Sequence, residues 1–368
     1  MFGCFGYDFY SGCDEILLII LQYMLGFGRC FGITKRGFVM RNVLFSVVVF
    51  VILLSGGFGA VVFGQGLEGE GAFAFGPADV AGDHTVFVRF DGKKRKVIVH
   101  IPPSYDQHQD VVPLVFMFHG GGGSAKQAAR AYHWKEESDQ GGFIVMFPEG
   151  TGFIRTWKSV HCCGSALKHD VDDVGFVRML IQQAGAQLRI DEKRIYATGM
   201  SNGGMFSHLL GSVMSDVFAA VAPVAGTIGG QVDSNSEEQR IGPPIQPIPI
   251  MMFHGQLDTN VQYFGGKSKG GFNTGRIDLS QEECVQFWVS ENGTVKKPIV
   301  EVSDSGNIIT RTFEDPDQGR NADVVHVTVV DQGHAWPGGK FNGIGDPPTQ
   351  EISATELIWE FFQAHPRK

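Results

Sequence analysis

A serine, an aspartate and a histidine occur along this chain in an order that suits nucleophilic catalysis. Ser201 is the centre of Gly199-Met200-Ser201-Asn202-Gly203, Asp258 follows an apolar run, and His334 lies further on, in a second glycine-containing segment. A serine hydroxyl is a poor nucleophile at neutral pH and needs a base, together with a carboxylate that orients the base. The sequence therefore predicts Ser201 as a nucleophile, His334 as its base and Asp258 as the orienting acid.

Each of these three residues also has a simpler interpretation. The pentapeptide could be a glycine-rich turn that only connects two elements, and Asp258 could be a turn residue. His326 lies within an expected strand and His365 in the tail, so both are weaker candidates for the base. The surroundings favour catalysis, because a short apolar strand precedes Ser201 and an expected helix follows it, as a nucleophile on a tight strand-to-helix turn requires.

A glycine run supplies candidate donors for an oxyanion hole. His119 is followed by Gly120, Gly121, Gly122 and Gly123, directly after an apolar strand. Backbone N–H groups of such a loop and of the residue after the nucleophile stabilise a tetrahedral oxyanion. We predict Gly121 and Asn202 as the donors, with Gly120 and Gly122 beside the substrate. No Lys-Ser/Thr pair follows the glycines, so a nucleotide-phosphate loop is not indicated.

Two tryptophans are candidates for lining the substrate pocket. Trp336 lies beside His334 and Trp157 in Arg155-Thr156-Trp157, although core packing would explain Trp157 equally well. The group Asp170, Asp172 and Asp173 resembles a cation site, but Asp173 is more simply the cap of the following helix. We expect neither a metal nor a cofactor.

The elements that position these residues alternate between strands and helices. Strands are expected at 84–90, 96–101, 112–118, 143–147, 194–198, 217–224, 248–253, 299–302, 308–313 and 324–330. Helices are expected at 125–138, 173–188, from the pentapeptide through 210, at 281–290 and at 353–364. Such alternation predicts an α/β fold with a mostly parallel central sheet and helices on both faces. Two long loops, 226–249 and 264–275, are candidate rims of a binding site.

Composition limits the class of protein. The chain has 368 residues, 43% hydrophobic and 19% charged, with a formal net charge of −9. These values fit a globular domain, and the acidic balance, without a Lys/Arg stripe, argues against a nucleic-acid partner.

The first part of the chain differs in composition from the rest. A short basic start at Met40-Arg41, an apolar run and small residues predict a signal peptide at 40–64, and hence a secreted protein, extracellular or periplasmic, that needs no membrane. An uncleaved anchor is the alternative. We interpret 1–39 as a doubtful extension or a second membrane-associated helix, 65–83 as a short connecting segment and 84–368 as a single domain.

Three of the six cysteines lie in the body of the chain. Cys162 and Cys163 are adjacent and could form a vicinal disulfide, or one of them could pair with Cys284. Three buried thiols are the remaining possibility. In an oxidising compartment, an odd number leaves one thiol free.

Several of these motifs together resemble one family, the polyhydroxybutyrate depolymerase-like esterases, which are grouped with the feruloyl and acetylxylan esterases of carbohydrate esterase family 1. The resemblance covers about residues 84–364 and is carried by His119-Gly120-Gly121-Gly122, Trp157, Cys162-Cys163-Gly164, residues 171–176, Gly199-Met200-Ser201-Asn202-Gly203-Gly204 and residues 333–338. It implies a secreted α/β-hydrolase that cleaves carboxylic esters with Ser201, Asp258 and His334.

The resemblance leaves the ester open. We expect feruloyl or similar plant cell-wall esters, with hydroxybutyrate polyester or oligoester hydrolysis as the nearest alternative and peptidase activity as a third. A catalytically silent hydrolase fold that binds a ligand is the alternative of a different class. Two departures bear on the choice: no separate polymer-binding domain is recognisable, and Thr294 follows Asn292-Gly293, where relatives often have a cysteine.

Overall fold

A computed structural model describes residues 80–368, apart from 271–274, 318–319 and 342–344. The described residues form one compact unit. The predicted segments 1–39, 40–64 and most of 65–83 lie outside the described residues, so the leader and the domain boundaries stay predictions. Among the described residues, every helix is too short or too polar to span a bilayer.

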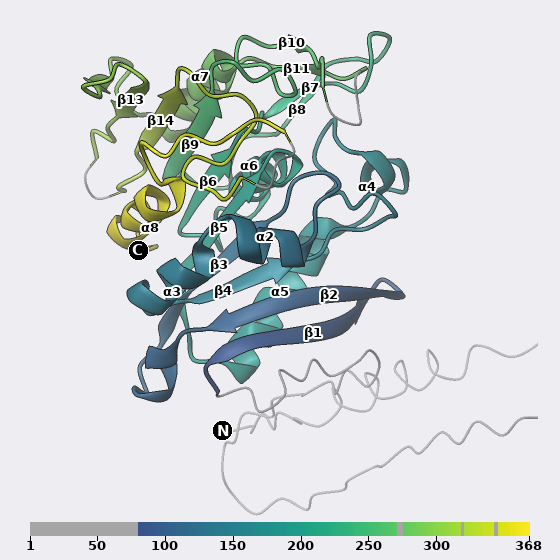
Figure 1. Ribbon diagram of the computed structural model, residues 1–368, viewed down its shortest axis with the longest axis vertical. Helices are drawn as coiled ribbons and strands as arrows, with labels where there is room; N and C mark the ends of the chain where they lie inside the picture. Colours follow the sequence, from purple (N-terminus) through teal and green to yellow (C-terminus); the bar gives the residue numbers. More distant parts are fainter. Residues whose placement is uncertain (1–79, 271–274, 318–319, 342–344) are drawn as a thin grey trace, which may run out of the picture. The chain divides into compact units, whose positions relative to one another are not determined.

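A ten-stranded sheet forms the centre of this unit (Figure 1). Its strands, in spatial order, are β1 (Gly82–Phe90), β2 (Lys93–Ile101), β4 (Ile144–Pro148), β3 (Val112–Phe118), β5 (Ile190–Met200), β6 (Ala220–Val224), β9 (Ile250–Gly255), β14 (Val324–Val329), β13 (Ile308–Phe313) and β12 (Ile299–Val302). The strands from β4 to β14 pair in parallel, and antiparallel pairs close both edges. The predicted mostly parallel α/β sheet is confirmed.

Alternating side chains of the buried strands build a core on each face of the sheet. In β3, Leu114, Phe116 and Phe118 belong to one core, and Val115 and Met117 to the other. The first core packs against α5 (Asp173–Gln187), α6 (Asn202–Val213) and α7 (Gln281–Asn292). The second packs against α2 (Ala125–Ala131), α3 (Trp134–Gly141) and α8 (Ala354–Ala364). Strands buried on both faces explain the near-continuous apolar runs in the sequence.

Three sequence-based expectations need correction. The helix expected at 125–138 is two helices, α2 and α3, because His133 takes a left-handed conformation with φ 59°. The strand expected at 217–224 begins only at Ala220. The cap of α5 is Asp172, whose side chain accepts the N–H of Gly175, and not Asp173.

The two long loops contain structure of their own. They contribute β7 (Gly229–Gln231), β8 (Gln239–Arg240) and β10 (Gly266–Lys267) to a second, four-stranded sheet, which β11 (Ile277–Asp278), just beyond the second loop, completes. Two short helices, η1 (Pro103–Asp106) and α4 (Gly164–Lys168), complete the described elements. Backbone hydrogen bonds of the small sheet therefore fix segments that composition alone marks as irregular.

A buried ion pair ties the β1–β2 hairpin to α5. Arg95 Nη2 donates to Asp173 Oδ1 over 2.9 Å, and the two side chains are 3% and 0% exposed. Removing one partner of such a pair leaves an uncompensated buried charge. We expect Arg95→Met to lower the free energy of unfolding by about 3–5 kcal/mol in urea titration. Lys93→Met, which removes an exposed pair with Asp91, should cost under about 1 kcal/mol; equal losses would refute this difference.

Candidate active site

Ser201 lies on a tight turn between β5 and α6, where the sheet is parallel. Its backbone has φ 57° and ψ −120°, a region that non-glycine residues rarely occupy. The turn requires glycine at Gly203, since a Cβ there would overlap the carbonyl oxygen of Phe118 on the neighbouring strand. Ser201 N–H donates to Val224 O over 2.8 Å. The chain thus holds this serine in a strained conformation at the carboxyl end of the sheet.

Asp258 and His334 come together from loops that follow two neighbouring strands, β9 and β14. His334 Nδ1 lies 2.6 Å from Asp258 Oδ2, although the residues are 76 positions apart. The aspartate side chain is fully buried and the histidine side chain is 16% exposed. This pairing was predicted from the order of the residues, and the imidazole of His334 contacts Asp258, not the nearby Asp331.

The surroundings of Asp258 keep it ionised. Burial would by itself raise its pKa, but His334 and then His254 outweigh burial, and the pKa lies well below the ordinary value. Backbone N–H groups of Asn260 and Val261 donate to its other oxygen, Oδ1, over 2.8 and 2.9 Å. A carboxylate with donors on both oxygens is fixed in orientation as well as in charge.

Hydrogen bonds at Gly120, Gly122 and Gly123 hold the glycine loop in place. Gly122 N–H donates to Arg155 O and Gly123 N–H to Gly120 O, over 2.8 and 2.9 Å. His119 anchors the start of the loop: Nδ1 lies 2.8 Å from Gly120 O, and Nε2 accepts the N–H of Gly150 over 2.9 Å. Burial lowers the pKa of His119 to about 4, so the ring is neutral at pH 7. The two contacts of the His119 ring restrict the backbone of the glycine loop beside Ser201.

One cavity of about 1120 Å³ joins these parts. Ser201, His334, Gly120, Gly121, Gly122 and Asn202 all line it. Its wall is apolar at Phe153, Ile154 and Leu167 and carries cations at Lys168 and Arg276. Val232, from the loop 226–249, also lines it, in keeping with the predicted place of that loop at the rim of a site. Arg276 lies one residue beyond the other predicted loop, 264–275.

The two tryptophans do not line this cavity, and this prediction was wrong. Trp157 is fully buried, stacks on Phe206 and donates from Nε1 to His119 O over 3.0 Å. Trp336 is 3% exposed and donates from Nε1 to Thr355 Oγ1. Each indole packs in a core and holds a loop that carries a candidate site residue. The two tryptophans therefore support the site and do not contact the substrate.

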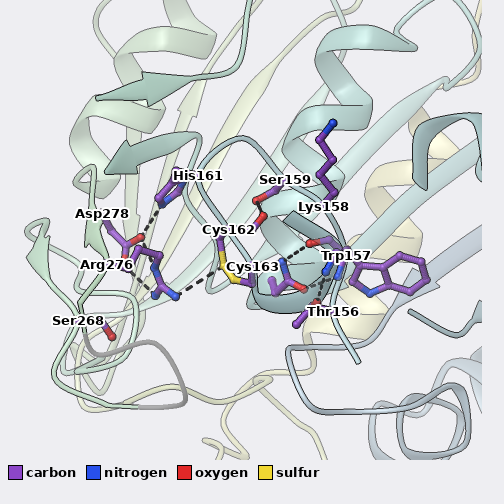
Figure 2. Close-up of a disulfide and its surroundings, with 12 residues drawn as sticks. Thr156, Trp157, Lys158, Ser159, His161, Cys162, Cys163, Ser268, Arg276 and Asp278 are labelled. Carbon is purple, nitrogen blue, oxygen red and sulfur yellow. Dashed lines mark hydrogen bonds and ion pairs between the residues drawn. A yellow bond between two sulfur atoms is a disulfide. The ribbon is translucent and has the colours of Figure 1, made fainter. Parts of the chain in front are cut away.

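The adjacent cysteines form a vicinal disulfide, and Cys284 is a buried free thiol. Figure 2 shows this disulfide between Trp157 and the buried pair of Arg276 and Asp278. Cys163 lines the cavity, and Arg276 Nη1 lies 3.7 Å from Cys162 Sγ. Of the alternatives left open by the sequence, the vicinal pairing is therefore the one present. Burial raises the pKa of Cys284 to about 11, so its thiol is protonated at neutral pH.

Sequence reasoning missed two residues around the site, Asp346 and Arg276, and the role of one side chain, that of Asn202. Asp346 Oδ2 accepts the backbone N–H of His334 over 2.6 Å, and Arg276 is a buried cation in the cavity wall. Asn202 contributes its side chain as well as its backbone, because its amide pairs with both the N–H and the C=O of Trp157. Only Asn202 carried a sequence signal, through its place in the pentapeptide.

Comparisons with known proteins find similarity to esterases. Residues 97–242 match the family model described as Esterase PHB depolymerase. "Putative esterase NocK" of Nocardia uniformis subsp. tsuyamanensis is 31% identical over 263 residues, which are 68% of this chain and 73% of that protein. Feruloyl esterase B of Piromyces equi is 31% identical over 206 residues, 55% of this chain and 37% of that protein.

A third relative is the poly(3-hydroxybutyrate) depolymerase of Ralstonia pickettii, 29% identical over 248 residues, which are 63% of this chain and 47% of that protein. The chain thus spans less than half the length of the Piromyces and Ralstonia proteins, but most of the Nocardia one. By that last relationship and the matching family model, the chain is an esterase and belongs to the PHB depolymerase family of esterases.

Proposed function

We propose that this protein is a secreted serine esterase that hydrolyses feruloyl or similar plant cell-wall esters. The observation that carries the serine mechanism is the 2.6 Å contact between His334 Nδ1 and Asp258 Oδ2, beside a cavity that Ser201 also lines. A fixed His–Asp pair next to a strained, accessible serine is the arrangement that activates a hydroxyl for acyl transfer.

The proposed reaction has two halves. Ser201 Oγ attacks the ester carbonyl carbon while His334 Nε2 takes the hydroxyl proton, and the carbonyl oxygen becomes an oxyanion facing the N–H groups of Gly121 and Asn202. Collapse of this intermediate breaks the bond to the alcohol, which leaves with the proton from His334. Water then attacks the acyl-enzyme by the same route and releases the acid. Asp258 holds the imidazole tautomer throughout.

Two features support an aromatic or apolar acyl group. The cavity wall includes Phe153, Ile154 and Leu167, and relatives of this chain include proteins named feruloyl esterases. Hydroxybutyrate oligomer hydrolysis is the second candidate, favoured by the relative named as a poly(3-hydroxybutyrate) depolymerase. Secretion is proposed from the apolar segment at 40–64.

The test is a substrate panel for residues 65–368, with methyl ferulate, acetylated xylan, a hydroxybutyrate oligomer and p-nitrophenyl acetate and butyrate. We expect the highest kcat/KM on methyl ferulate. A preference for the hydroxybutyrate oligomer would move the assignment to polyester degradation. Folded protein that turns over none of these esters, and whose serine does not react with a fluorophosphonate, would contradict the proposed esterase mechanism.

Phe153 offers a direct probe of the acyl site. Its side chain is fully exposed on a turn closed by the Thr151–Thr156 bridge, and it lines the cavity. Loss of an apolar contact in a substrate site costs about 1–3 kcal/mol. We expect Phe153→Ala to raise KM for methyl ferulate about tenfold, with little change for p-nitrophenyl acetate. Phe87→Ala, an exposed phenylalanine on β1, is the control, and equal KM values for all three proteins would exclude an acyl-binding role.

A further inference from the structure

His254 is a buried histidine that contacts Asp258 and does not line the cavity. It lies in β9, four residues before Asp258, and both side chains are fully buried. His254 Nε2 lies 2.7 Å from Val261 O and 3.3 Å from Asp258 Oδ2. A single ring nitrogen therefore faces both the carboxylate and the backbone of the loop that carries it.

The hydrogen-bond partners define the tautomer of His254. A carbonyl oxygen only accepts, so the proton must be on Nε2. The other nitrogen, Nδ1, is buried and has no hydrogen-bond partner among the residues that the structure describes. His254 thus presents one N–H, on Nε2, to two acceptors.

This N–H completes the set of donors around the Asp258 carboxylate. Oδ1 accepts from the backbone N–H groups of Asn260 and Val261, and Oδ2 faces His334 Nδ1 at 2.6 Å and His254 Nε2 at 3.3 Å. The shorter contact of His254, to Val261 O, connects the end of β9 to the loop after Asp258. Rotation of the carboxylate away from His334 would break contacts on both oxygens.

We propose that His254 is a positioning residue of this esterase: it fixes the Asp258 carboxylate, and through it the imidazole of His334, in the geometry that proton transfer requires. The inference rests on the proposed triad. Misplacement of a reacting group by about 1 Å costs up to about 100-fold in rate, so a residue that never meets the substrate can control kcat through this contact.

Packing is the competing explanation, because His254 also meets the ring of Tyr263 edge to face, with centroids 6.0 Å apart. The two explanations differ in what a substitution does. His254→Leu keeps an apolar side chain of moderate size but removes the N–H. His254→Gln keeps an N–H at about the distance of Nε2 from the backbone. If only side-chain volume mattered, His254→Leu would retain as much activity as His254→Gln.

The experiment compares these variants in the full chain with His365→Leu as a matched control. His365 is also buried, with Nδ1 2.6 Å from Phe361 O and Nε2 3.7 Å from a carboxylate, that of Asp323. It lies at the end of α8 and does not line the cavity. We expect His254→Leu to lower kcat on p-nitrophenyl butyrate about 10- to 100-fold with KM nearly unchanged, His254→Gln to recover most of that loss, and His365→Leu to keep the wild-type kcat.

A second measurement separates positioning from stability. The proton between His334 Nδ1 and Asp258 Oδ2 should give a downfield proton NMR signal, which we expect to shift or broaden in folded His254→Leu and to stay unchanged in His365→Leu. Wild-type kcat and an unshifted signal in His254→Leu would overturn this inference alone. Full activity of Ser201→Ala would instead overturn the proposed function on which it rests.

Discussion

Ser201→Ala should reduce kcat for ester hydrolysis by about six orders of magnitude, to the residual rate that binding and the oxyanion hole provide without a nucleophile. The expected loss is large because in the proposed mechanism Ser201, His334 and Asp258 act as a unit. Without the serine hydroxyl, His334 keeps its 2.6 Å contact with Asp258 but has no hydroxyl proton to accept. The measurement is kcat on p-nitrophenyl butyrate, together with labelling by a fluorophosphonate, which reacts only with an activated serine.

Ser207→Ala is the matched control for this variant. Ser207 lies on α6, is fully buried, and its Oγ donates to Gly203 O over 2.9 Å. Its loss should change stability slightly and leave both kcat and labelling intact. Labelling that persists in Ser201→Ala would mean that another serine is the nucleophile, and a parallel loss in Ser207→Ala would mean that any change in α6 impairs the turn.

The meeting of the catalytic candidates in space could be predicted from the sequence better than the residues that surround them. Ser201, Asp258 and His334 follow β5, β9 and β14, which are parallel strands of one sheet, and the carboxyl ends of such strands meet at one edge of the sheet. Applying this rule requires only the positions of the strands, and the apolar runs in the sequence indicate those positions. The Asp258–His334 contact across 76 positions is therefore a consequence of topology that a single sequence can supply.

The tryptophans show where this reasoning fails. Proximity in sequence placed Trp157 and Trp336 near the site, but whether a side chain faces the cavity or the core depends on packing partners far away in the chain. Trp157 stacks on Phe206 of α6 and Trp336 packs against Tyr132 before α3. No local pattern around either tryptophan identifies those partners.

The break between α2 and α3 has a similar origin. The residues from Ala125 to Ser138 are compatible with one helix, and neither glycine nor proline interrupts them. The left-handed conformation of His133 turns the chain so that Trp134 packs in the same core as Phe362 of α8. Tertiary contact thus overrides local propensity at a position where the sequence carries no signal.

Asp258→Asn should lower kcat about 10⁴-fold while the fold is retained. The reason lies in the donors around the side chain. Backbone N–H groups of Asn260 and Val261 donate to Oδ1, so the amide oxygen of an introduced asparagine must occupy that position. Its NH₂ group then faces His334 Nδ1, which has to accept. The proton moves to Nε2, and the nitrogen that should receive the Ser201 proton is already occupied.

The same substitution has a pH signature in stability. Because the pKa of Asp258 in the folded protein is lowered, its ionised form stabilises the native state above the unfolded value of about 3.9, and this contribution is lost as pH falls through the folded pKa. The gap in Tm between the wild type and Asp258→Asn should therefore be widest near neutral pH and narrow in acid.

Asp331→Asn, at an exposed position three residues before His334, is the control and should match the wild type in kcat and Tm. Near-wild-type kcat in Asp258→Asn would show that the carboxylate does not set the tautomer of His334. The orientation of His334 would then have to come from another contact, such as the hydrogen bond from its backbone N–H to Asp346.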